Sequence, residues 1–90
     1  MALTADTRIL LSTDPDTEPV TGTVGGLIRH HRRVNPCTLI TLEQSLGHQG
    51  RLPNQPADQR ESILLHNLDT LTLADLNRLE PNTTITLAQD

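Results

Sequence analysis

The chain contains no Phe, Tyr or Trp, and this absence restricts the kind of hydrophobic core that it can build. Aromatic rings are the largest single contributors to a core, at about 150–250 Å² buried per ring. Leu, Ile and Val must replace them, and they account for 24 of the 90 residues. A domain of this size buries a smaller share of its surface than a large domain does, and a single cysteine excludes an internal disulfide. We therefore expect one small domain, residues 1–90, that gains stability by forming an oligomer or by docking into a larger assembly.

The stretch 68–87, LDTLTLADLNRLEPNTTITL, carries the most consistent structural signals. Thr72 followed three residues later by Asp75 is close to a capping box, and leucines at helical spacing follow it. A Pro-Asn pair then ends the helix, and the alternation after it is typical of a strand. We predict a helix over 72–80 and a strand over 83–87.

The other elements are less sharply defined. β-branched residues predict a strand in the first half of 20–34, and the Gly25–Gly26 pair predicts a turn or a close backbone approach. The segment 27–34 fits either a second short strand or two helical turns. Alternation favours a strand over 35–46, with a helix opening at Asn-Pro as the alternative, and a further strand is predicted over 61–67. Together these elements predict a small α+β fold, with one short helix and an antiparallel sheet or partly open barrel.

Two segments are predicted as polar connections. The apolar run 7–13 ends at DPDTEP (residues 14–19), whose acids and prolines place it at the surface. The segment 47–60 holds two Gly and two Pro and few apolar residues, so we predict a long polar loop that is either functional or disordered.

The basic segment of 29–33 is the first candidate site, and its members are Arg29, His30, His31, Arg32 and Arg33. Guanidinium groups bind carboxylates and phosphates through paired hydrogen bonds, and the histidines add positive charge below about pH 6.5. We expect these side chains, with Arg51 of the polar loop, to form a surface that contacts a protein partner. Binding of a phosphate-bearing ligand or nucleic acid is the alternative. The net charge of −4 disfavours this alternative because it repels phosphate groups, and the chain has no aromatic residue to stack on a base.

Residues that suit zinc are scattered along the chain, at His30, His31, Cys37, His48 and His66. No pair has the C-x-x-C or H-x-x-x-H spacing of a preorganised site, so we expect no metal and no other cofactor. Neither the serines nor Cys37 carry a local signature of nucleophilic catalysis, so we do not expect an enzyme. Cys37 is instead predicted to be a small buried apolar residue.

The chain is also predicted to be soluble and cytoplasmic, without a membrane partner. No apolar run approaches the roughly 18 residues of a membrane span. The first residues lack the basic and apolar regions of a signal peptide, and a lone cysteine fits a reducing compartment.

Three short motifs follow one another near the end of the chain: LTLADL at 71–76, LEP at 79–81 and TITL at 84–87. With the apolar run before them, from residue 62 onward, they resemble the first half of a SpoA-type domain. This is the surface-presentation-of-antigens module of flagellar and type III secretion rotor complexes. The resemblance implies a small, non-catalytic, β-rich module that intertwines with a copy of itself or with a relative. The same region also resembles the strand–helix–Pro–strand ending of the nucleotide-binding domain in aspartate carbamoyltransferase regulatory chains.

These observations favour a non-enzymatic structural or adaptor subunit that docks into a larger protein assembly or a homo-oligomer. The alternative is a regulatory protein that binds a phosphate-bearing ligand or nucleic acid through the segment Arg29–Arg33.

Overall fold

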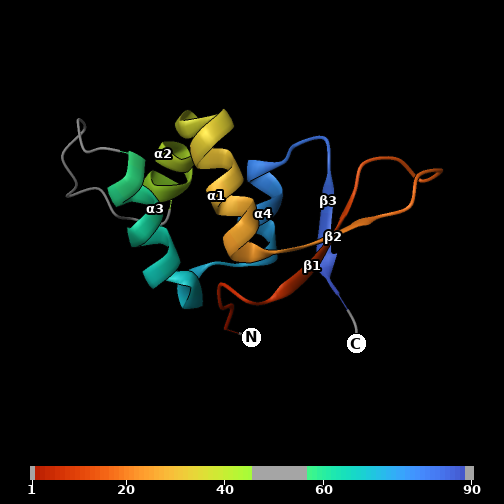
Figure 1. Cartoon of the computed structure of the whole chain (residues 1–90), viewed down its shortest axis with the longest axis horizontal. Coiled ribbons are helices and arrows are strands. Elements are labelled where there is room, and N and C mark those ends of the chain that lie inside the picture. The colour runs from red at the N-terminus through yellow and green to blue at the C-terminus, as the bar shows by residue number, and fades with distance from the viewer. Residues whose placement is uncertain (1, 46–56, 89–90) are drawn as a thin grey trace.

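The structure, a computed structural model, describes residues 2–45 and 57–88. Three short strands, β1 (Arg8–Ser12), β2 (Val20–Thr23) and β3 (Thr84–Leu87), form an antiparallel sheet in the order β2-β1-β3. The helices lie on one side of this sheet, and the β1–β2 connection extends away from them (Figure 1). The described residues thus have the small α+β fold predicted from the sequence, with an open sheet rather than the barrel alternative.

The register of the sheet divides its side chains between an inner and an outer face. Ile9 of β1 lies opposite Leu87 of β3, and Leu10 lies opposite Thr86. Neighbouring residues of a strand point to opposite faces. Ile9 is fully buried beneath the helices, whereas Thr86 is exposed. The inner face therefore belongs to the core, and the outer face carries threonines open to solvent.

The helices are α1 (Val24–Val34), α2 (Pro36–Ser45), α3 (Ala57–His66) and α4 (Leu73–Leu79), with a 3-10 turn η1 (Leu68–Thr70) before α4. Helix α1 follows β2 without a break and contacts α2 and α3, while α4 contacts α2 and β3. None of the helices within the described residues is long and apolar enough to cross a membrane.

Helix α1 begins in close contact with the N-terminal segment. The Thr23 hydroxyl caps it by accepting a hydrogen bond from the Gly26 N–H at 3.0 Å. The Gly25 N–H donates to the Ala5 carbonyl at 3.0 Å, and a Cβ on Gly25 would lie 3.1 Å from that oxygen. A side chain at this position would therefore be in tighter contact than most Cβ atoms, and glycine avoids that contact. The close backbone approach predicted for Gly25–Gly26 is confirmed, and of the two predictions for 27–34 the helix is correct.

The strands predicted over 35–46 and 61–67 are wrong, because residues 36–45 form α2 and residues 61–66 belong to α3. In α2, Leu39 and Leu42 are both buried, and a helix places residues three apart on one face. A short mixture of Leu and Thr fits either period, so the apparent alternation did not distinguish the two structures. The Asn-Pro pair, a helix start signal, distinguished them correctly. Helix α2 begins at Pro36, as the alternative prediction of a helix over 35–46 required.

Helix α3 begins at Ala57, inside the segment 47–60 that was predicted as a polar loop. Residues 46–56, with Arg51, lie outside the described residues. In α3, Leu64 is fully buried and Leu65 is partly buried against the core. Leu64 and Leu65 of the apolar run that suggested a strand therefore pack against the core from a helix.

The helix predicted over 72–80 is confirmed as α4. The Thr72 hydroxyl accepts a hydrogen bond from the Asp75 N–H at 3.3 Å, and the Asp75 carboxylate accepts one from the Thr72 N–H at 2.9 Å. These two bonds complete a capping box in which Asp replaces the usual Glu or Gln. Leu76 and Leu79 are buried at the expected spacing. The strand predicted after this helix is confirmed as β3.

The core is entirely aliphatic and draws on every described helix and on strands β1 and β3. Its buried members are Leu3, Ile9, Val24, Leu27, Ile28, Leu39, Leu42, Leu64, Leu68, Leu71, Leu76, Leu79 and Ile85. Strand β2 contributes no buried apolar side chain to this described core, so it is held by its backbone pairing with β1.

The Asn77 side chain of α4 covers the free edge of β3. The Ala88 N–H donates to the Arg8 carbonyl at 3.0 Å, so by the alternation of an antiparallel ladder Ile85 directs its N–H and C=O away from β1. The Asn77 Oδ1 accepts from the Ile85 N–H at 2.8 Å, and its Nδ2 donates to the Ile85 carbonyl at 3.2 Å. Nδ2 also donates to the Leu73 carbonyl at 2.8 Å. One side-chain amide thus takes the place of a neighbouring strand.

Replacing Asn77 by Ala is expected to lower the free energy of unfolding by about 1–3 kcal/mol, because two backbone groups of β3 lose their partners. Urea unfolding followed by far-ultraviolet circular dichroism measures this in a chain without Trp. Hydrogen exchange should become faster at the Ile85 amide, while the Thr86 amide, which faces β1, stays protected. Unchanged stability together with unchanged exchange at Ile85 would show that the amide does not secure this edge.

Candidate functional site

Two arginines of the basic segment on α1 are engaged in contacts within the protein. Arg29 Nε lies 3.3 Å from Glu61 Oε1 of α3, and Arg32 Nε contacts Glu61 Oε2. The Glu61 side chain is 12% exposed, compared with 55% for Arg29 and 34% for Arg32. One sheltered carboxylate therefore receives two guanidinium groups and ties α1 to α3.

His31 is buried and pairs with Glu80, the residue that follows the last turn of α4. Its Nε2 lies 2.6 Å from Glu80 Oε1, and its side chain is 7% exposed. The ring of His30 meets the His31 ring edge-on, with 5.9 Å between their centroids. His31 thus joins α1 to the end of α4 and is not presented to a ligand.

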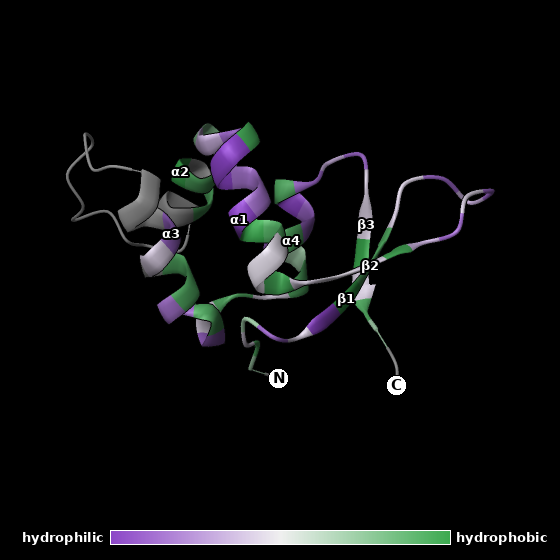
Figure 2. Ribbon diagram, in the orientation of Figure 1, coloured by the Kyte–Doolittle hydropathy of each residue, from purple (hydrophilic) through white to green (hydrophobic). Residues whose placement is uncertain are grey.

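Only part of the predicted contact surface faces solvent. Figure 2 shows hydrophilic residues concentrated along the C-terminal half of α1. Arg29, His30 and Arg33 are exposed there, and the Arg29 guanidinium is already paired with Glu61. Positive side chains near the C-terminal end of a helix also interact favourably with its dipole, which gives the segment a role in helix stability.

The sequence did not single out the two acidic residues that complete this cluster. Glu80 is 49 residues from its histidine partner, and Glu61 lies on a different helix from its arginines. Neither follows the i, i+3 or i, i+4 spacing by which a sequence reveals ion pairs within one helix. The packing of α1 against α3, and the position of the residue that follows α4 beside His31, bring these charges together.

Within the part of the chain that the structure describes, the residues that suit a metal ion do not converge. In residues 2–45 and 57–88, no three His, Cys, Asp or Glu side chains form a group that could hold an ion. Cys37 is exposed, so the prediction that it is buried is wrong. The reason is the helical period of α2, which turns Leu39 and Leu42 toward the core and leaves Cys37 outside. His48 lies outside the described residues.

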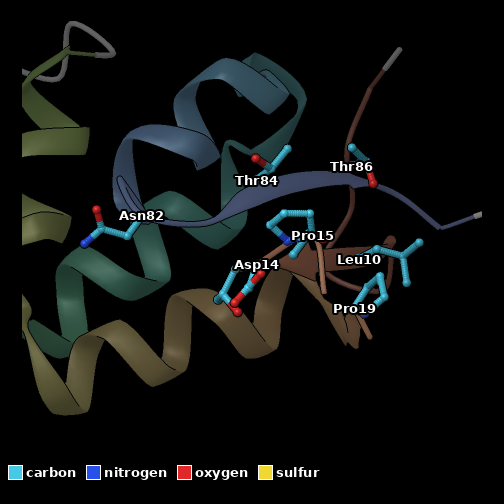
Figure 3. Close-up of a pocket in the computed structure, with 9 residues that line it drawn as sticks. Leu10, Asp14, Pro15, Pro19, Asn82, Thr84 and Thr86 are labelled. Carbon is cyan, nitrogen blue, oxygen red and sulfur yellow. The ribbon is translucent and has the colours of Figure 1, made fainter. Parts of the chain in front are cut away.

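A groove of about 400 Å³ runs along the outer face of the sheet. The residues that line it come from β1, the β1–β2 connection, the α4–β3 turn and β3, and they include Leu10, Asp14, Pro15, Pro19, Asn82, Thr84 and Thr86 (Figure 3). The groove combines hydroxyl groups with apolar proline and leucine surfaces, and it contains one carboxylate.

A turn shapes the connection that borders this groove. The Asp14 carbonyl accepts a hydrogen bond from the Thr17 N–H at 3.1 Å, and the Asp14 carboxylate accepts one from the Asp16 N–H at 2.9 Å. Asp at the first position and Pro at the second are the residues that such a turn favours. Because Asp14 is used in this way, its carboxylate serves the shape of the connection.

Comparisons with protein-family models, with curated proteins and with solved structures find no match to this chain. The resemblance of 62–87 to SpoA-type domains stays a prediction. The function is therefore argued from the geometry of the chain itself.

Replacing Glu61 by Gln is expected to lower the free energy of unfolding by about 1–2 kcal/mol, because a sheltered carboxylate loses its charge beside two guanidinium groups. Arg29→Gln should cost less than about 1 kcal/mol, since this side chain is 55% exposed, and the loss should shrink at high salt. Urea unfolding measures both. Glu18→Gln, at an exposed position of the β1–β2 connection, is the matched control. A Glu61→Gln variant as stable as this control would contradict the assigned role.

Proposed function

We propose that this protein is a non-enzymatic structural or adaptor subunit that docks into a larger protein assembly or a homo-oligomer. The observation that carries the proposal is the one-sided sheet, whose helices cover only the inner face (Figure 1). An antiparallel sheet can leave one face in water. Here, however, that face also carries an apolar groove floor, in Leu10 and the two prolines beside it.

The chemistry of the outer groove supports binding of polypeptide rather than catalysis. General acid–base or nucleophilic catalysis needs at least two groups within hydrogen-bond reach of a substrate. Among the residues that line this groove, Asp14 is the one ionisable group, and it is bonded to its own turn. Threonine hydroxyls and proline rings are, in contrast, suited to hydrogen bonding and van der Waals contact with another chain.

The small size of the core supports the same proposal. Its buried side chains are all aliphatic, and β2 adds none of them within the described residues. Apolar burial is the dominant favourable contribution to folding, at about 25 cal/mol per Å². A partner that covers the exposed side of the sheet adds burial that this chain does not obtain alone.

The ion pairs on α1 weigh against the phosphate-binding alternative. Two of the three guanidinium groups of the segment 29–33 already contact Glu61, whose negative charge lies within the same cluster. A phosphate placed there has to compete with that carboxylate and is repelled by it. Arg33 and His30 remain exposed, but no aromatic residue exists to stack on a base.

Light scattering coupled to size-exclusion chromatography tests the proposal, with concentration read from refractive index because the chain lacks Trp and Tyr. We expect a mass above that of one 9.9 kDa chain, or a defined protein complex when the tagged protein is purified from its native host. A folded monomer that brings down no protein partner would contradict the proposal.

Filter binding with labelled oligonucleotides and nucleotides at low salt separates the two functions. We expect that Arg33→Ala abolishes no binding of these ligands. Arg8→Ala is the control variant, because Arg8 is exposed as Arg33 is. Binding that falls steeply with salt and depends on Arg33 but not on Arg8 would favour the phosphate-binding alternative, because counterion release is the signature of phosphate contacts.

A further inference from the structure

Strand β2 has a free edge whose backbone groups are open. The Val24 N–H donates to the Thr7 carbonyl at 3.1 Å, in the same register that pairs β2 with β1. Backbone groups alternate along an antiparallel strand, so Val20 and Gly22 point theirs toward β1 and Thr21 points its N–H and C=O outward. Thr21 is exposed, and no hydrogen bond found within the described residues covers these two groups. The edge of β3 differs, because Asn77 occupies its outward backbone groups at Ile85.

A groove of about 270 Å³ borders this open edge on the inner side of the sheet. Leu11, Leu27, Gly22 and Gly26 contribute much of its lining. A Cβ on Gly22 would meet nothing closer than the Leu11 Cδ1 at 3.5 Å, an ordinary contact, so the strand has room for a side chain at this point. Val20 also lines the groove and is 65% exposed. Among the described residues, Val20 and Val34 are the large hydrophobic side chains that are exposed, and Val20 is the more exposed of the two.

We propose that this edge pairs with the β2 edge of a second copy of the chain, around a two-fold axis at Thr21. In this register the two Thr21 residues exchange N–H···O=C bonds, and Val20 of each copy lies opposite Gly22 of the other. Residues that flank a hydrogen-bonded pair lie only about 4.5 Å apart at Cα, with their side chains close together. Each Val20 side chain therefore enters the space that the other copy's Gly22 leaves, beside Leu11. The two sheets join into one sheet of six strands.

The self-complementarity of the strand is the reason for choosing a second copy as the partner. An isologous interface requires one patch to carry both halves of every contact. Here a donor and an acceptor lie at Thr21, with a protruding valine one residue before it and an unfilled position one residue after it. A two-fold axis satisfies all of these at once. An unrelated peptide would need the same arrangement by coincidence.

The pairing is short, and this makes the side-chain contact important. Pro19 directly precedes β2, two residues before Thr21, and it has no N–H to donate to a second copy. Few backbone hydrogen bonds are therefore available to the second copy beyond those at Thr21. Burial of the valine in the groove has to supply much of the remaining affinity. The β2 pairing rests on the proposed function. It specifies a second copy of the chain as the partner and the β2 edge as the surface.

Sedimentation equilibrium or light scattering of Val20→Asp tests the surface. We expect a dimer for the unchanged protein and at least a tenfold weaker dimer for the variant, because a carboxylate then enters a groove that is lined by Leu11 and Leu27 and bordered by the carboxylate of Glu80. Val34→Asp is the matched control, since Val34 is 61% exposed at the end of α1, and it should leave the dimer unchanged. Circular dichroism confirms that each variant is folded.

The register is tested by exchanging the valine and the glycine. Val20→Gly and Gly22→Val should each weaken the dimer, the first by removing the protruding side chain and the second by filling the space opposite it. The double variant places valine opposite glycine again, so the dimer should recover. A double variant no stronger than either single one would overturn the register.

A disulfide supplies an independent measurement of the two-fold axis. In a Cys37→Ser background, Thr21→Cys should form a disulfide-linked dimer under mild oxidation, since directly opposed residues lie about 5.5 Å apart at Cα. Thr86→Cys, on the outer face of β3, is the control and should not crosslink at comparable rates. Equal crosslinking of the two variants would overturn the proposed pairing.

The outcomes separate this inference from the proposed function. A larger assembly that is unaffected by Val20→Asp would overturn the β2 pairing and leave the structural or adaptor role standing. A protein that is monomeric but captures a different protein partner would also overturn the pairing and leave that role standing. A folded monomer with no partner overturns both.

Discussion

The position of α1 is the constraint on which the arrangement of the other helices depends. Its apolar side, formed by Val24, Leu27 and Ile28, is buried in the core. Hydrophobic burial is non-directional, so an aliphatic core alone leaves several orientations of a helix close in energy. Hydrogen-bonded charges are directional, and Glu61 and Glu80 supply them from α3 and from the end of α4. The basic segment of α1 thus fixes how three helices meet.

How much of this fold can be predicted depends on whether the signals are local. The helix α4 and the strand β3 were predictable because the capping box, the leucine spacing and the Pro-Asn stop all lie within the same stretch of sequence. The helices α2 and α3 were not. Their apolar runs are short and fit either period, and burial of Leu39, Leu42 and Leu64 is decided by contacts with distant elements. Here tertiary packing overrides the weak local preference for strand.

The candidate site shows the same limit in another form. A cluster of arginines and histidines is visible in the sequence, but its partners are not, since Glu61 and Glu80 come from other helices. Three guanidinium groups in five residues therefore indicate that an anionic group binds there. They do not indicate whether that group belongs to the same chain or to a separate molecule. The exposure of Val20 and the empty space at Gly22 are likewise invisible in the sequence, because they depend on which strand lies at the edge.

The two edges of the sheet differ, and this difference determines what kind of assembly β2 pairing can produce. If both edges of a three-stranded sheet were open, further copies of the chain could pair with each edge. Such edge-to-edge pairing would produce an open-ended polymer. The Asn77 amide occupies the outward backbone groups of Ile85, so β3 offers a poor template for another strand. The β2 edge carries the open groups of Thr21, and pairing two identical β2 edges uses both of them. The product is a dimer whose outer edges are the two β3 strands, and on each of them Asn77 blocks further pairing at Ile85.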